Sequence, residues 1–117
     1  MTSKIGQVKS MFEVPEKYLD GRQFDIKVRV ETVQDFTRNL KFDRVLDIGC
    51  GDGSLSLPLL GRSNKLTLLD ISSNMLDLVR NKIPFEHVAK VQLINQDIMS
   101  ARFESESFDL ILCIGVL

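Results

Sequence analysis

Residues 45–53 read VLDIGCGDG, and this stretch decides which fold the sequence predicts. Its apolar first half is typical of a strand, and three glycines follow at alternate positions, Gly49, Gly51 and Gly53. Glycines in such a turn carry no Cβ, so a ligand can approach backbone N–H groups beside the positive end of a following helix. Asp47 lies just before the turn, where a carboxylate repels a pyrophosphate but attracts a cationic group. We therefore expect a ligand-binding loop directly after the first strand.

Apolar runs and helical segments alternate from residue 44 onward. The runs predicted as strands are Arg44–Ile48, Lys65–Leu69, Val91–Ile94 and Phe108–Leu117. Helices are predicted over Ser54–Leu60 and Ser73–Lys82, the second with Ser72 or Ser73 as its N-cap. This alternation is typical of βαβ units whose parallel strands are covered on both faces. The predicted fold class is α/β, a Rossmann-like doubly wound parallel sheet.

The sheet is preceded by a different kind of sequence, an N-terminal arm with helices over residues 1–41. Pro15 begins an early helix that Asp20 and Gly21 end, and helical spacing of apolar residues predicts another helix over Phe24–Leu40. Residues 42–117 form the ligand-binding part, and no repeat or linker divides it.

Two further acids follow the next two predicted strands. Asp70 lies 70 − 49 = 21 residues after the first glycine, where a carboxylate can accept hydrogen bonds from both hydroxyls of a ribose. Asp97 follows the third strand, where it can accept the amino group of an adenine. Apolar surface for the two faces of that ring can come from Ile71, Met75 and Ile98.

Composition excludes several other classes of protein. Fifteen Lys and Arg against sixteen Asp and Glu give a net charge of −1, which is not the basic surplus of a duplex-binding protein. The apolar run Leu110–Leu117 is far shorter than the roughly 20 residues that span a bilayer. Two cysteines, Cys50 and Cys113, make no disulfide framework, so we expect a reducing, cytoplasmic setting.

The glycine loop and the acid 21 residues further on leave a second interpretation open, a nicotinamide-dependent oxidoreductase. Gly49 and Gly51 match the G-x-G-x-x-G fingerprint, but Ser54 stands where its third glycine belongs. Asp47 also disfavours a pyrophosphate at this loop.

Four segments in order resemble the motifs of class I S-adenosylmethionine-dependent methyltransferases. They are Val45–Gly53 for the first motif, Leu68–Leu76 for the ribose-binding second, Asn95–Ile98 for the adenine segment and Phe108–Leu117 for the fourth strand. The ordered set is far more specific than the first motif alone. The resemblance implies a sheet with its first four strands in the order 3-2-1-4 and flanking helices, preceded by N-terminal helices.

The resemblance also implies a role for each matched residue. Asp47 supports the ammonium of the methionine moiety, Asp70 holds the ribose and Asp97 the adenine amino group. The remaining cofactor-binding residues line the loop, the ring faces and the sulfonium: Gly49, Cys50, Gly51, Gly53, Ile71, Met75, Ile98 and Ile114. The implied reaction is an in-line displacement in which a nucleophile attacks the methyl carbon and the neutral thioether leaves. It depends on proximity and alignment, requires no metal, and leaves the catalytic residues unidentified.

We therefore expect a methyltransferase that acts on a small-molecule acceptor, with no nucleic-acid or membrane partner. A non-catalytic relative that serves as a binding or scaffold protein is a further alternative. Because the sequence stops within or just after the fourth predicted strand, we expect a chain that is truncated there. The open edge of that strand could then support self-association.

Overall fold

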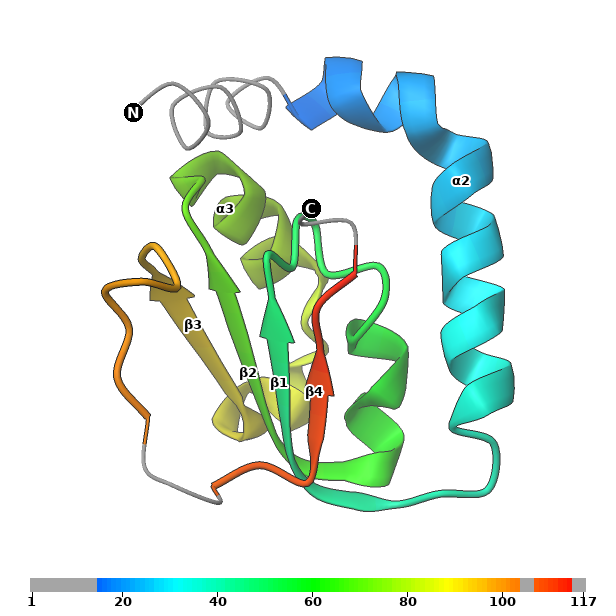
Figure 1. Cartoon of the computed structure of the whole chain (residues 1–117), viewed down its shortest axis with the longest axis vertical. Coiled ribbons are helices and arrows are strands. Elements are labelled where there is room, and N and C mark those ends of the chain that lie inside the picture. The colour runs from blue at the N-terminus through cyan, green and yellow to red at the C-terminus, as the bar shows by residue number, and fades with distance from the viewer. Residues whose placement is uncertain (1–14, 104–106, 115–117) are drawn as a thin grey trace.

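The computed structural model describes residues 15–103 and 107–114, with side chains from Asp25 onward. Its centre is a sheet of four parallel strands whose arrows all point toward the same end (Figure 1). The strand order is β3-β2-β1-β4, which confirms the 3-2-1-4 order. The strands are β1 (Phe42–Ile48), β2 (Ser63–Asp70), β3 (Val91–Asn95) and β4 (Leu110–Leu112).

Helices precede and connect the strands. The long α2 (Pro15–Phe36) comes before β1 and runs alongside the sheet, and α3 (Ser73–Lys82) connects β2 with the segment before β3 (Figure 1). Two short 3-10 helices, η1 (Leu57–Arg62) and η2 (Phe85–Lys90), precede β2 and β3. These elements confirm the Rossmann-like arrangement expected from the alternating pattern.

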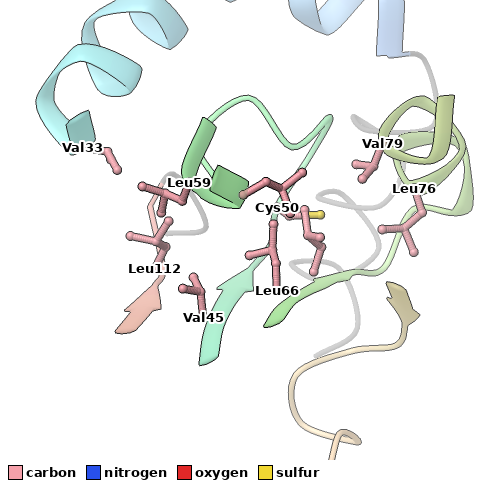
Figure 2. Close-up of a cluster of buried hydrophobic side chains, with 10 residues drawn as sticks. Val33, Val45, Cys50, Leu59, Leu66, Leu76, Val79 and Leu112 are labelled. Atoms are coloured by element: carbon pink, nitrogen blue, oxygen red, sulfur yellow. The ribbon is translucent and has the colours of Figure 1, made fainter. Parts of the chain in front are cut away.

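One face of the sheet carries the main hydrophobic core. Because successive strand residues point to opposite faces, Val45 of β1 and Leu66 of β2, which are register partners, project together. Both are completely buried. Side chains from α2, η1 and α3 converge on this face, among them Val33, Leu59 and Val79 (Figure 2). The sheet is therefore anchored to all three helices through one continuous cluster.

The start of α3 follows its sequence signal. Ser72 is the N-cap, and its hydroxyl accepts the backbone N–H of Met75 at 3.3 Å. The cap satisfies one of the donors that every helix N-terminus leaves unpaired. Arg80 and Lys82 lie in the last turn, where positive charge interacts favourably with the helix dipole.

Three predicted boundaries were wrong. No break occurs at Asp20 and Gly21, because a single helix runs through them from Pro15 to Phe36 and absorbs the modest cost of one glycine. The helix predicted over Ser54–Leu60 is instead the 3-10 helix η1, which begins at Leu57. Pro58 in its first turn cannot donate a backbone hydrogen bond, and the residues before it form a turn. Strand β4 is also shorter than predicted, and residues 115–117 lie outside the described part of the chain.

Arg62 connects the end of α2 to the sheet. Its guanidinium donates to the carbonyl oxygens of Thr37 and Leu40, to Gln34 Oε1 at 2.9 Å and to Thr37 Oγ1 at 3.1 Å. Thr37 is 1% exposed, and its carbonyl oxygen also accepts the N–H of Leu40 at 3.0 Å, so its hydroxyl oxygen is the buried acceptor that would lose its described donor. One side chain of η1 thus caps the C-terminal end of α2.

We expect Arg62→Met to lower the free energy of unfolding by about 1.5–3 kcal/mol, because it removes several hydrogen bonds from a charged donor, two of them to the buried Thr37. Arg38→Met is the matched control, since the described ion-pair partner of Arg38 is Asp35 and both side chains are 71% exposed. The control should cost no more than about 0.5 kcal/mol. Urea denaturation measures both, and equal losses would contradict this role of Arg62.

Candidate functional site

The glycine loop after β1 is hydrogen-bonded to the end of β2. The N–H groups of Gly49 and Cys50 both donate to the carbonyl oxygen of Leu69, at 2.8 and 3.1 Å. The loop needs its glycines, because Gly49, Gly51 and Gly53 have φ angles of 65°, 57° and 82°. The carboxyl ends of β1 and β2 therefore form one hydrogen-bonded unit, as the predicted ligand loop requires.

Asp70 connects this loop to the start of α3. One carboxylate oxygen accepts the N–H of Gly51 at 2.8 Å, and the other accepts the N–H of Ser72 at 2.9 Å. Asp70 is only 2% exposed. Burial raises the pKa of Asp70, and the backbone donors, including Ile71, partly oppose that rise. The predicted ribose acid thus lies against the glycine loop and orders it.

Asp47 lies under the same loop. It is 1% exposed, and no group in the described part of the chain forms a hydrogen bond with its Oδ2 atom. Burial raises the pKa of Asp47 to about 7; the negative charges of Asp70 and Asp52 add to the rise, and the Ser56 hydroxyl partly opposes it. Ser56 Oγ itself makes no hydrogen bond of normal geometry with residues 15–103 or 107–114. The site therefore contains a buried carboxyl oxygen that no described group satisfies.

Asp52 serves the loop itself. Its Oδ1 accepts the N–H and the hydroxyl of Ser54, at 3.1 and 2.6 Å, and its Oδ2 accepts Lys82 Nζ at 2.6 Å. Burial opposes ionisation, but the hydrogen bonds from Lys82 and Ser54 outweigh it and lower the pKa of Asp52. The sequence did not predict this contact of Lys82, because the two residues are thirty positions apart and no local pattern links them.

The two cysteines occupy different surroundings. Cys50 is buried, and its thiol makes a weak hydrogen bond to the carbonyl oxygen of Gly51 at 3.4 Å. Burial and the nearby carboxylates raise the pKa of Cys50, so the group stays a thiol. Cys113 is exposed, and neither cysteine forms a disulfide.

The predicted adenine-binding residues differ in exposure. Ile71 is half-buried and Ile98 is 39% exposed, whereas Met75 is completely buried in α3. Asp97 is half-buried, and its Oδ1 accepts the N–H of Met99 at 3.0 Å. Ile114 packs against the core cluster beyond the end of β4.

Of Gly51, Gly53 and Gly61, Gly53 has the least room for a side chain. A Cβ there would lie 2.9 Å from Leu57 Cδ1 and 3.2 Å from Val79 Cγ2. We expect Gly53→Ala to destabilise the protein by about 1–3 kcal/mol, from the clash and the positive φ together. Gly61→Ala is the control, since no atom lies within 4 Å of its Cβ position, and should be neutral within about 1 kcal/mol. Thermal unfolding compares the two; a tolerated Gly53→Ala would contradict the close packing.

The raised pKa of Asp47 predicts a pH-dependent stability difference. Between its ordinary value of 3.8 and about 7, the folded protein keeps a proton that the unfolded chain has lost. Asp47 therefore makes the folded state progressively less stable as pH rises through that range. We expect Asp47→Asn to remove this pH dependence, because an amide does not titrate. The free energy of unfolding of the variant minus that of the wild type should then rise by about 1–3 kcal/mol from pH 5 to pH 8. Urea titrations at both pH values measure the change; a constant difference would contradict it.

Two features of other protein classes, a membrane-crossing helix and a cluster of metal ligands, are absent from the described residues. Within residues 15–103 and 107–114, no helix is long and apolar enough to cross a membrane. In the same part of the chain, no three His, Cys, Asp or Glu side chains gather where they could hold a metal ion.

Comparison with known proteins gives matches to methyltransferases. The chain is 32% identical over 95 residues to the ribosomal RNA small subunit methyltransferase A of Mesomycoplasma hyopneumoniae (strain 232), covering 80% of this chain and 34% of that protein. It is 31% identical over 94 residues to the ubiquinone biosynthesis O-methyltransferase of Glaesserella parasuis serovar 5, covering 77% of this chain and 40% of that protein. The chain thus spans well under half the length of these relatives.

Solved structures show the same fold. Magnesium protoporphyrin IX methyltransferase (ChlM) from Synechocystis PCC 6803, solved with bound SAH, superposes with a TM-score of 0.73 at 23% identity, covering 92% of this chain and 57% of that one. A family described as "Methyltransferase domain" matches residues 45–117. The chain therefore belongs to the methyltransferase domain family, whose cofactor is S-adenosylmethionine, as the resemblance implied.

Proposed function

We propose that this chain binds S-adenosylmethionine over the glycine loop and takes part in methyl transfer to a small-molecule acceptor. The observation that carries the proposal is the buried Asp47 carboxyl, whose Oδ2 has no hydrogen-bond partner among the described residues and lies beneath the loop of a methyltransferase domain. Such an oxygen is costly unless a ligand donor satisfies it. The ammonium of a methionine moiety, directly or through a water, is a donor of the right charge.

The charge of the site fits a cationic cofactor. Asp47, Asp52 and Asp70 influence one another electrostatically, and only Asp52 has a cationic partner among the described residues. A ligand that carries an ammonium and a sulfonium would lower the repulsion that raises the pKa of Asp47. Gly51 adds room, since no atom lies within 4 Å of its Cβ position.

Asp70 is the proposed ribose acid. Its two oxygens accept the N–H groups of Gly51 and Ser72, and a carboxylate oxygen can accept a second hydrogen bond. The remaining lone pairs suit the two ribose hydroxyls. One oxygen of Asp97 accepts the N–H of Met99, which leaves the other as the proposed acceptor for the adenine amino group. The adenine ring would then lie between Ile71 and Ile98. Met75 is completely buried, so it would support the ring from behind the surface.

The bound cofactor would supply an activated methyl group whose sulfur leaves as a neutral thioether. The residues of this chain would contribute orientation: Asp47 and the loop hold the methionine part, Asp70 holds the ribose, and Ile114 packs beside the sulfonium. Alignment of this kind is the main catalytic requirement of an in-line displacement.

A small-molecule acceptor is supported by the near-zero net charge of −1 and by the acceptors named for several relatives. These include the ubiquinone enzyme and a demethylmenaquinone methyltransferase from Listeria welshimeri. One relative acts on ribosomal RNA, so the absence of a nucleic-acid partner stays a prediction. The cytoplasmic setting and self-association through the edge of β4, where Ile111 is 55% exposed, also stay predictions.

Calorimetry with two ligands tests the proposal. S-adenosylhomocysteine carries the ammonium, whereas 5′-methylthioadenosine has the same nucleoside and a thioether but no amino-acid part. At pH 8, where Asp47 is ionised, we expect Asp47→Asn to weaken binding of S-adenosylhomocysteine by about ten- to a hundredfold, because a charge-assisted bond of roughly 1.5–3 kcal/mol is lost. Binding of 5′-methylthioadenosine should change by less than about twofold, since that ligand makes no such bond.

Three results would each contradict part of the proposal. Equal weakening of both ligands would show that Asp47 acts only through the loop and not on an ammonium. Binding of a nicotinamide dinucleotide in place of S-adenosylhomocysteine would restore the oxidoreductase alternative. Retained binding of S-adenosylhomocysteine with no methyl transfer to any member of an acceptor panel would favour the non-catalytic alternative.

A further inference from the structure

The glycine loop is held from outside by the last residue of α3. Lys82 Nζ donates to Asp52 Oδ2 at 2.6 Å and to the Asp52 carbonyl oxygen at 3.2 Å. The Asp52 side chain is 11% exposed and that of Lys82 is 43% exposed, so water screens this pair less than a surface pair. Lys82 therefore contacts both the side chain and the backbone of the loop.

Asp52 has little capacity left for a ligand. Its second oxygen already accepts the N–H and the hydroxyl of Ser54. The position between Gly51 and Gly53 also makes its backbone part of the turn. Asp52 is thus a group that shapes the loop and is itself held by Lys82.

The opposite end of α3 holds the same loop by a separate route. Ser72, the N-cap, donates its N–H to Asp70, and Asp70 accepts the N–H of Gly51. Between the two ends, Val79 packs against Gly53 closely enough that a Cβ would lie 3.2 Å from it. The helix and the loop are therefore joined at three points. The third point is the ion pair of Lys82, at the C-terminal end of the helix.

We propose that Lys82 is a positioning residue for cofactor binding: its ion pair with Asp52 fixes the glycine loop against α3. In that arrangement Gly51 N–H and the Asp70 carboxylate keep the geometry that receives the nucleoside. This inference rests on the proposed function, because it assigns the loop to the cofactor. Among the described residues, Asp52 is the hydrogen-bond partner of Lys82 Nζ, through both its carbonyl oxygen and its carboxylate.

The test compares Lys82→Met with Lys82→Arg and with a control on the same helix. Arg80→Met is that control, since Arg80 pairs with Asp77 at 2.7 Å while both side chains are more than 60% exposed, at 61% and 64%. We expect Lys82→Met to weaken binding of S-adenosylhomocysteine by about five- to twentyfold and Arg80→Met by less than about twofold. Lys82→Arg should restore most of the affinity, because Arg keeps the charge and can reach the same carboxylate.

A second readout needs no ligand. Amide hydrogen exchange by NMR should show Gly51 and Gly53 exchanging several-fold faster in Lys82→Met, with Leu68 in the core of β2 unchanged, because only the loop is released. If Lys82→Met does not fold, Asp52→Asn tests the same contact from the loop side, since the amide oxygen can still accept from Ser54.

The outcomes separate the two proposals. If the wild type binds S-adenosylhomocysteine and Lys82→Met binds it equally well, the positioning role is overturned and the proposed function stands. If the wild type does not bind it, the proposed function fails, and unchanged exchange at Gly51 in Lys82→Met would overturn the positioning role as well. Faster exchange across the whole sheet would overturn it in favour of a general stabilising role.

Discussion

The Asp70 carboxylate is the interaction on which the site depends. Its two oxygens accept backbone N–H groups from two separate segments, Gly51 in the loop after β1 and Ser72 at the start of α3. Backbone donors have no side-chain freedom, so such bonds fix the relative position of the segments and not just of one side chain. The same acid that is proposed to recognise the ribose therefore also builds the surface on which the cofactor would lie.

The burial of the site's acids lowers the stability of the folded state. Burial raises the pKa of both Asp47 and Asp70, which means that the folded state disfavours their ionised forms. Hydrophobic packing offsets the cost, because Val45 and Leu68 lie in the same strands and are completely buried. Asp52 differs from the other two acids because Lys82 neutralises it. Among the described residues, Asp52 has a cationic partner, whereas Asp47 and Asp70 are the acids proposed to face the ligand.

The sequence was sufficient to predict the features that depend on local pattern. The loop glycines, Asp47 and Asp70 follow apolar runs directly, and the N-cap role of Ser72 depends on residues within one helical turn. The strand order came from the resemblance. The contacts of Arg62 and Lys82 could not be predicted, because each joins segments 22 to 30 residues apart and a lone basic residue has no periodicity. The helix end predicted at Asp20 and Gly21 was wrong, because the cost of one glycine is too small to end a helix of 22 residues.

Asp109 shows that the far end of the sheet also matters to the site. Its two oxygens accept the N–H groups of Asp43 and Arg44, each at 2.8 Å, and its own N–H donates to the Arg44 carbonyl oxygen. Strand β4 pairs with only three residues of β1, so these bonds supply much of what specifies its register. A slip by one residue would turn Leu112 out of the core and move Ile114 from its place beside the cluster that includes Cys50. The packing of Ile114 against the core cluster is therefore set in part by a carboxylate at the opposite end of β4.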